Sequence, residues 1–300
     1  MALAHVQLKD LTGQVRKTGS DVFEHGNYVD IWLGEFTGVN PPRKVVAIKV
    51  LRSIFTDEEV RVLNNKLLRE ARLWSTLNHP NIASFLGITT DIAPRSAPSL
   101  VSPFYEFGSL PDYCHNHKPS LGKKIDLLLQ FASGLAYLHS RGIIHGDIKP
   151  ANVLIDNDRK VLVADFGLSR VLEVTGYTTR STPGTVRYMS PELLNPPQSE
   201  SDSTSGPIIR TTKPADVWAF AVAATEIFSS KLPYHRYPSD NKALLFVVSG
   251  GTLAKDDYKD DIPRSVWTML RECWDAAPAK RPTMDEIRRF IIDYAKVKGL

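Results

Sequence analysis

The amino-acid sequence predicts an α+β fold with two lobes, a β-rich first lobe with one long helix and a mainly helical second lobe. The first hundred residues hold strand-like runs, such as the β-branched KVVAIKVL at 44–51, and one helical pattern at 56–77. After Gly108 the pattern becomes helical, so we expect the lobes to join near 103–107. A chain of 300 residues with a 42% hydrophobic fraction is long enough to bury a sizeable core.

The helix at 56–77 has a start signal and a buried face. Thr56 and Glu59 form a capping-box pattern at its beginning. Its apolar stripe comprises Val60, Leu63, Leu67, Ala71 and Trp74. A strand is expected over 99–110, ending in a turn at Gly108. Further helices are expected at 121–140, 214–229, 264–274 and 283–296.

Composition narrows the class of protein. The net charge of +4 comes without a block of Lys or Arg, which gives no reason to expect a nucleic-acid partner. Cys114 and Cys273 form neither a disulfide framework nor a metal-ligand spacing, so we expect a reducing, cytoplasmic compartment. The N-terminus does not match a signal peptide, and the most apolar helical run, 217–228, is too short to cross a bilayer. The Ser- and Pro-rich stretch at 196–207 is expected to be a surface loop.

The stretch ANVLIDNDRKVLVADFG predicts a β-hairpin, with strands at 153–155 and 161–164 around a turn at 156–159. In an antiparallel pair, the start of the first strand lies beside the end of the second. The hairpin therefore brings Asn152 and Asp165 to the same edge. An amide oxygen and a carboxylate suit Mg²⁺, which completes its coordination with waters and phosphates.

Two more polar residues lie within reach of this edge. Asp147 precedes Asn152 by five residues, and its carboxylate could orient an attacking hydroxyl. Lys149 could neutralise charge on a phosphate oxygen. Taken singly, each of these residues is more often a turn or cap residue than a functional one. Their combination around one hairpin favours a site.

With these motifs in place, the chain resembles a eukaryotic protein kinase domain, nearest to the tyrosine-kinase-like group of serine/threonine kinases. The matching motifs occur in the family's order over about residues 20–297. They are VAIK at 46–49, HGDIKPAN at 145–152, DFG at 165–167, SPE at 190–192, DVWAF at 216–220 and CWDAAPAKRPTM at 273–284.

The resemblance implies a bilobal protein-kinase-like fold, with a β-rich N-lobe that carries one regulatory helix and a mainly helical C-lobe. We expect an N-terminal extension at 1–19, an N-lobe at 20–103 and a C-lobe at 104–297. The implied activity is transfer of the γ-phosphate of ATP, with Mg²⁺, to Ser or Thr hydroxyls of protein substrates in signalling. Two alternatives remain: a pseudokinase that serves as an interaction scaffold, and a small-molecule phosphotransferase.

The family's roles then fall on particular residues. Asp147 would be the catalytic base, Lys149 a contact to the γ-phosphate, and Asn152 and Asp165 the Mg²⁺ ligands. Thr185 would bridge Asp147 and Lys149, and the lysine and threonine together fit Ser/Thr specificity.

The nucleotide site is implied in the same way. Lys49 would bind the α- and β-phosphates and pair with Glu70, which lies on the flank of the apolar stripe. The alternative for Glu70 is a surface pair with Lys66. Tyr105 would donate its N–H to adenine, and Pro103 would offer its carbonyl. The remaining pocket residues would be Gly26, Ile31, Ala47, Leu154 and Ser102, the last as gatekeeper.

The sequence departs from the family in two places. The glycine-rich pattern falls on EHGNYVDI at 24–31, where only Gly26 remains and Glu24 and Val29 replace the other glycines, so we expect weaker ATP binding. Gly146 stands where the family often has an arginine that pairs with a phosphate on the activation segment. We therefore expect activity that does not require phosphorylation of Thr178, Thr179, Ser181 or Thr182.

A structural ion pair is also implied. Glu192, in SPE, would pair with Arg281, which precedes a helix start in the last motif. A buried pair of this kind would lock the activation segment to the C-lobe. The alternative for Arg281 is a surface cation.

Overall fold

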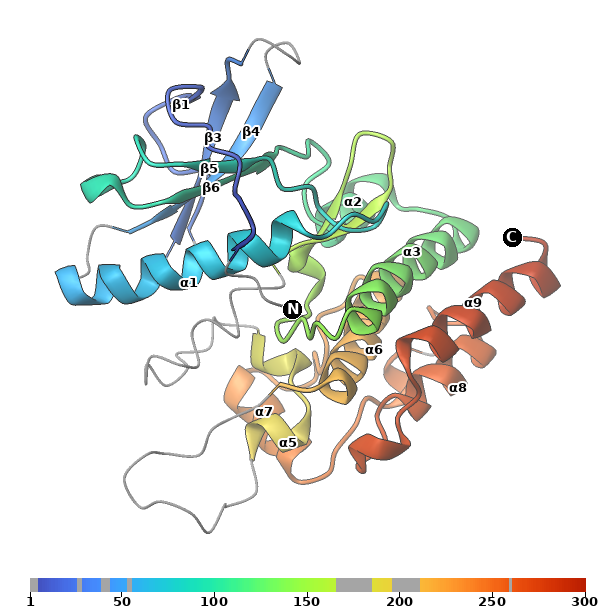
Figure 1. Cartoon of the computed structure of the whole chain (residues 1–300). Helices are drawn as coiled ribbons and strands as arrows, with labels where there is room; N and C mark the ends of the chain where they lie inside the picture. The colour runs from blue at the N-terminus through green and yellow to red at the C-terminus, as the bar shows by residue number, and fades with distance from the viewer. Residues whose placement is uncertain are drawn as a thin grey trace, which may run out of the picture. The chain divides into compact units, whose positions relative to one another are not determined.

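The computed structural model describes residues 5–25, 29–38, 44–52, 56–165, 185–195, 211–258 and 261–300. The chain divides into two compact units, Met1–Asn78 with Ile82–Tyr105 and His79–Asn81 with Glu106–Leu300. The N-terminal unit is β-rich with one long helix, and the C-terminal unit is mainly helical (Figure 1). The predicted α+β class is therefore confirmed.

The N-terminal unit is built on a six-stranded antiparallel sheet in the order β1-β3-β4-β6-β5, with β2 also paired to β3. Its β-branched runs form the strands, and the run predicted at 44–51 is β4. The strands are β1 (Val15–Lys17), β2 (Glu24–His25), β3 (Val29–Phe36), β4 (Lys44–Leu51), β5 (Gly87–Thr89) and β6 (Ser99–Pro103), with a 3₁₀ turn at Pro94–Ser96.

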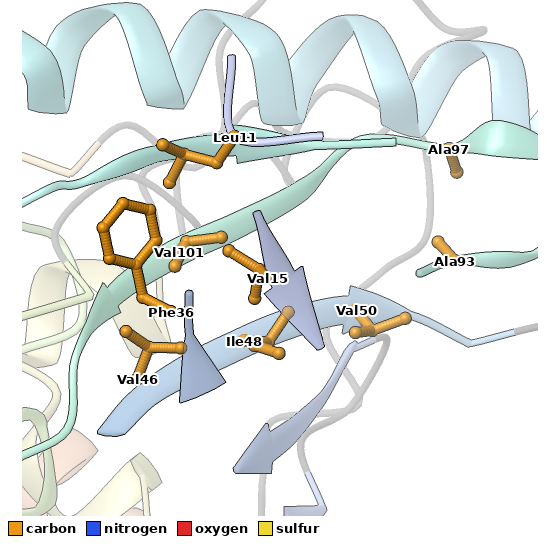
Figure 2. Close-up of a cluster of buried hydrophobic side chains, with 9 residues drawn as sticks. All are labelled: Leu11, Val15, Phe36, Val46, Ile48, Val50, Ala93, Ala97 and Val101. Atoms are coloured by element: carbon orange, nitrogen blue, oxygen red, sulfur yellow. The ribbon is translucent and has the colours of Figure 1, made fainter. Parts of the chain in front are cut away.

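One face of this sheet forms a hydrophobic core. Side chains alternate along a strand, so Val46, Ile48 and Val50 of β4 point to the same side and are almost fully buried. Figure 2 shows Leu11 and Val15 packed onto this face. Part of the segment expected to be an N-terminal extension thus lies in the core of this unit. Asp10 also forms a bridge to Ile88 of β5.

Helix α1 (Asp57–Ser75) is the helix predicted at 56–77, and its capping box between Thr56 and Glu59 is present. Leu67, Ala71 and Trp74 of its apolar stripe are buried. The Trp74 indole Nε1–H donates to the Ala83 carbonyl at 2.7 Å, so the end of α1 is tied to the segment that leads into β5.

The C-terminal unit confirms the four expected helices, and its described residues form three more. The short helices α2, α5 and α7 are not expected from the sequence, since none of them has a long apolar period. Helix α6 is buried nearly all round, as predicted for its apolar run, and α3 and α9 lie side by side (Figure 1). The helices are α2 (Leu110–His117), α3 (Leu121–Ser140), α5 (Pro191–Leu194), α6 (Lys213–Ser229), α7 (Asp240–Val248), α8 (Arg264–Glu272) and α9 (Met284–Lys298), with 3₁₀ turns at Pro150–Asn152, Thr185–Tyr188, Lys255–Asp257 and Pro278–Lys280.

Strands β7 (Val153–Ile155) and β8 (Val161–Val163) form the second, two-stranded sheet. In the described parts of the chain, no helix combines the length and apolarity needed to cross a membrane.

Candidate active site

The hairpin β7–β8 has the predicted register. Val153 pairs with Val163, and the Ala164 N–H donates to the Asn152 carbonyl at 2.9 Å. The turn is fixed by Asp156, whose Oδ1 accepts hydrogen bonds from the Asp158 and Lys160 N–H groups. Asn152 therefore lies beside the residue that precedes Asp165, which itself has a left-handed backbone with φ of +60°. The rest of the DFG motif lies outside the described residues.

Asn152 is hydrogen-bonded to Asp147. Its side-chain Nδ2 donates to the Asp147 carbonyl at 2.8 Å and to Asp147 Oδ2 at 2.9 Å. The residue is only 7% exposed, so these bonds are made where water competes little. Because Nδ2 is held by Asp147, the amide oxygen Oδ1 is the atom that Asn152 can offer to a ligand.

The Lys149 ammonium lies between Asp147 and Thr185. Its Nζ is 3.2 Å from Asp147 Oδ2 and 3.3 Å from Thr185 Oγ1. The sequence expectation had Thr185 bridging the other two, whereas in the structure the contacts run through the lysine. Asp147, Lys149, Asn152 and Thr185 thus form one connected polar group in the C-terminal unit.

A buried carboxylate that we had not singled out holds the loop before Asp147. Asp216, at the start of α6, accepts the His145 N–H at Oδ2 and the Gly146 N–H at Oδ1, both at 2.8 Å. His139 donates its Nε2–H to the same carboxylate at 2.9 Å. The signal in the sequence was the aspartate of DVWAF, which we had interpreted only as part of a buried helix.

His145 joins this loop to β8 as a neutral imidazole. Its Nε2–H donates to the Ala164 carbonyl at 2.9 Å, and its Nδ1 accepts the Asp147 N–H at 3.2 Å. An imidazole that accepts at one nitrogen and donates at the other carries one proton. Burial lowers the pKa of His145, against the opposing influence of Asp216 and Asp147, and so favours this state.

Glu192 and Arg281 form the expected ion pair. Arg281 donates from Nη1 and Nη2 to the two carboxylate oxygens at 2.7 and 2.9 Å. It also donates to the carbonyls of Pro214 and Asp275, and its side chain is completely buried. Burial acts to raise the pKa of Glu192, but the hydrogen bonds and charge of Arg281 outweigh it and lower the pKa. The alternative of a surface cation is wrong.

In the N-terminal unit, the second face of the sheet carries the residues expected to bind nucleotide. Ile31 pairs with Lys49, and Ala47 pairs with Ser102, and directly opposed residues point to the same face. Lys49 is only 8% exposed, and Glu70 of α1 is 4% exposed. Such burial argues against Glu70 as half of a surface pair. Leu154 belongs to the C-terminal unit, in the middle of β7.

The predicted hinge follows β6. Pro103 pairs with Val46, and the Phe104 N–H donates to the Val45 carbonyl at 3.2 Å. Phe23, which we had not singled out, meets Phe104 edge to face at 5.3 Å and is 53% exposed. The feature of the sequence that could have pointed to Phe23 is its position directly before the degenerate glycine pattern at 24–31.

Two of the three glycine positions of that pattern lie within the described residues, and their surroundings differ. Glu24 pairs with Ile31, so its side chain lies on the same face as Ile31 and Lys49. Val29 begins β3 and is 8% exposed, so it serves packing. Gly26 lies outside the described residues, as do the candidate phosphorylation sites at 178–182 and the loop at 196–207.

Comparisons with known proteins agree with this arrangement. Residues 19–291 match the family model described as protein tyrosine and serine/threonine kinase. The chain is 30% identical over 255 residues to human receptor-interacting serine/threonine-protein kinase 1, covering 80% of this chain and 36% of that protein. It is also 30% identical over 283 residues to serine/threonine-protein kinase STY46 of Arabidopsis thaliana, covering 91% and 43%.

A tyrosine kinase is among the relatives too. Human tyrosine-protein kinase FRK is 28% identical over 277 residues, covering 90% of this chain and 49% of that protein. The chain spans less than half the length of each of these three relatives. The family model covers most of the chain and the first relatives are serine/threonine kinases, which confirms the resemblance to the tyrosine-kinase-like group. The chain is a protein kinase domain and belongs to the family of protein tyrosine and serine/threonine kinases.

Proposed function

We propose that this chain transfers the γ-phosphate of ATP to Ser or Thr hydroxyls of protein substrates. The observation that carries the proposal is the group formed by Asp147, Lys149, Asn152 and Thr185. The lysine in the catalytic loop and the threonine that it contacts favour Ser/Thr over Tyr as the acceptor. The names of two relatives, both serine/threonine-protein kinases, support the same choice.

Asp147 is proposed as the residue that receives the substrate's proton. Both of its side-chain contacts, from Asn152 and Lys149, go to Oδ2. We therefore assign Oδ1 to the hydrogen bond with the attacking hydroxyl, which would orient it for in-line transfer. The Lys149 ammonium, 3.2 Å away, would neutralise charge on the transferred group.

The residues present fit a magnesium ion. Asn152 Oδ1 and the Asp165 carboxylate are oxygen donors of the type that Mg²⁺ takes. Such an ion would draw its other ligands from phosphates and water. When bound, Mg²⁺ would neutralise the phosphate oxygens of ATP.

Lys49 is proposed to bind the α- and β-phosphates of ATP, with Glu70 as its partner. Ile31, Ala47, Leu154 and Gly26 would line the nucleotide site, with Ser102 as gatekeeper and the Tyr105 N–H and Pro103 carbonyl facing adenine. We propose a kinase domain of about 20–297, extended by the preceding segment because Leu11 and Val15 lie in its core.

The test is transfer of labelled γ-phosphate to casein, comparing wild type with Asp147→Asn. Asp158→Asn is a matched control, because Asp158 is an exposed aspartate in the turn of the neighbouring hairpin. Asp147→Asn should lose at least about a hundredfold in rate, and the control should not change. Equal signals from wild type and Asp147→Asn would refute the proposal. Nucleotide binding without any transfer would identify a pseudokinase, and label on tyrosine alone would refute the Ser/Thr assignment.

A further inference from the structure

A carboxylate at the base of the degenerate glycine pattern is held by an arginine and a histidine. Asp30 Oδ1 accepts a hydrogen bond from Arg52 Nε at 2.8 Å and lies 3.0 Å from His25 Nδ1. His25 and Asp30 are directly opposed across β2 and β3, and Asp30 is opposed to Val50 of β4. Asp30 therefore ties together the two strands on either side of residues 26–28 and the end of β4.

This cluster lies behind the nucleotide-facing side of the sheet. Asp30 shares a face with Val50, whereas its neighbour Ile31 shares a face with Lys49. The Lys17 ammonium lies on the same side as Asp30, 3.6 Å from the centre of the Trp32 ring. The charges of the cluster thus point away from the face that carries Lys49, and their effect on a bound nucleotide is exerted through the backbone of the hairpin.

The charge state of the cluster supports a bracing role. Burial acts to raise the pKa of Asp30, but the hydrogen bonds from Arg52 and His25 outweigh it and lower the pKa. The carboxylate is therefore ionised at neutral pH and attracted by the Arg52 guanidinium.

We propose that Asp30, bound by His25 and Arg52, is a positioning residue that fixes the β2–β3 hairpin for binding the phosphates of ATP. The family uses glycines so that the loop backbone can approach phosphates. This chain has Glu24 and Val29 at two of those positions, and the ion-paired carboxylate holds the same hairpin from behind. The inference rests on the proposed function, because it names how the nucleotide site of that function is held.

A matched control exists on the same strand. Glu35 of β3 pairs with Arg16 of β1 at 2.5 Å; its side chain is 19% exposed and that of Arg16 is 64% exposed. The corresponding values are 18% for Asp30, 27% for Arg52 and 70% for His25. Glu35→Gln therefore removes a carboxylate that is as exposed as Asp30 and also pairs with an arginine, at the other end of β3.

The experiment is calorimetric titration with Mg²⁺ and a non-hydrolysable ATP analogue. Asp30→Asn and Arg52→Gln should each weaken binding about fivefold, the effect expected for loss of one partly buried ion pair worth about 1 kcal/mol. The double variant should be no weaker than either single variant, because the two residues act through one contact. Arg52→Lys should bind more tightly than Arg52→Gln, and the melting temperatures should match that of Glu35→Gln.

An unchanged affinity in Asp30→Asn would overturn the inference, as would an equal loss in Glu35→Gln. An affinity loss that tracks a fall in melting temperature would also overturn it. Because the readout is binding, a wild-type chain that binds the analogue but transfers no phosphate refutes only the proposed function. A wild-type chain that does not bind the analogue overturns the inference itself.

Discussion

The two hairpins that carry the candidate site residues, β2–β3 and β7–β8, are held by different forces. The first depends on polar contacts near the surface, in which Asp30 is 18% exposed and its partners Arg52 and His25 are 27% and 70% exposed. The second depends on backbone bonds and on buried, neutral groups, with Asn152 7% and His145 1% exposed. Screened surface pairs contribute up to about 1 kcal/mol, whereas an orphaned buried polar group costs about 1–3 kcal/mol.

The difference shows where the sequence can vary. The β2–β3 hairpin departs from the family's glycine pattern, and we infer that Asp30 and its partners hold it in place. The β7–β8 hairpin keeps the family's residues, and its polar groups have specified partners: Asn152 Nδ2 binds Asp147, and Asp156 Oδ1 binds the N–H groups of Asp158 and Lys160. Substitutions that change charge should therefore affect the β2–β3 hairpin most. Substitutions that remove a single hydrogen bond should affect the β7–β8 hairpin most.

The largest effect on stability is expected at the ion pair between Glu192 and Arg281. Like the polar groups of the β7–β8 hairpin, the Arg281 side chain is buried. Glu192→Gln should lower the free energy of unfolding by about 3–5 kcal/mol, because it leaves the fully buried Arg281 without its counter-charge. Urea unfolding measures this value. Lys231→Gln removes the exposed pair with Asp261 and should cost less than about 1 kcal/mol. Similar losses in the two variants would contradict the distinction by burial.

Asn152→Ala should reduce kcat about a hundredfold, because Asp147 loses the hydrogen bonds that hold both its backbone and its carboxylate. Asn81→Ala is the matched control. Asn81 is also 7% exposed, and its Nδ2 donates to the Val161 carbonyl at 2.9 Å. Asn81→Ala should be less stable than wild type, but at temperatures below its melting temperature its kcat should equal that of wild type. If kcat falls equally in Asn152→Ala and Asn81→Ala, both residues stabilise the fold and neither has a specific role in catalysis.

Acid should weaken the two hairpins in different pH windows. The lowered pKa of His145 means that the folded chain binds fewer protons than the unfolded chain below about pH 6.5. Its stabilisation is therefore complete above pH 6.5 and is lost as pH falls further. Asp30, whose pKa is lowered from 3.8, loses its contribution only below that value.

Urea unfolding between pH 7.5 and 5.5 should therefore show a greater loss for wild type than for His145→Gln. The variant retains His79, whose pKa burial also lowers, so the difference isolates His145. If the free energy of unfolding falls equally with pH in both proteins, His145 is not held neutral in the folded state.

Glu24→Gln should lower the KM for ATP about two- to threefold without changing kcat. Its carboxylate lies on the same face of the sheet as Lys49. Removing one negative charge near the phosphates should strengthen ATP binding modestly, because water screens the repulsion. Glu24→Gly separates charge from backbone freedom, because it removes both the carboxylate and the Cβ. A much larger gain in Glu24→Gly than in Glu24→Gln would show that the hairpin still lacks its glycines.

The smallest effect is expected from alanine at Thr178, Thr179, Ser181 and Thr182 together. Activity should stay within about tenfold of wild type, since Gly146 cannot pair with a phosphate. The measurement is kcat/KM of protein made without other kinases present. A loss of kcat/KM greater than tenfold would show that a phosphate on this segment is bound by another cation.

Local patterns predicted the fold well where one element carries its own signal. The strand at 44–51, the helix at 121–140 and the capping box at Thr56 all occur where the sequence placed them. Helix α2 was missed because it is short, although Ser109 and Asp112 form a capping box that was readable.

Contacts between distant residues could not be predicted in this way. Asp216 binds groups at residues 139, 145 and 146, and no local pattern encodes a separation of 70 residues. Asp30 also looked like an ordinary strand residue, because one partner lies on β2 and the other directly after β4. The site residues Asp147, Lys149 and Asn152 were readable, since one loop and one hairpin bring them together.

Gly146 has a φ of +80°, a conformation that costs other residues about 1–2 kcal/mol. The loop that presents Asp147 thus adopts its shape without strain and without an arginine that waits for an anion. On the proposed function, this loop offers no cation at position 146 to a phosphate on residues 178–182. A phosphatase that acts on those residues would then leave the shape of the loop unchanged.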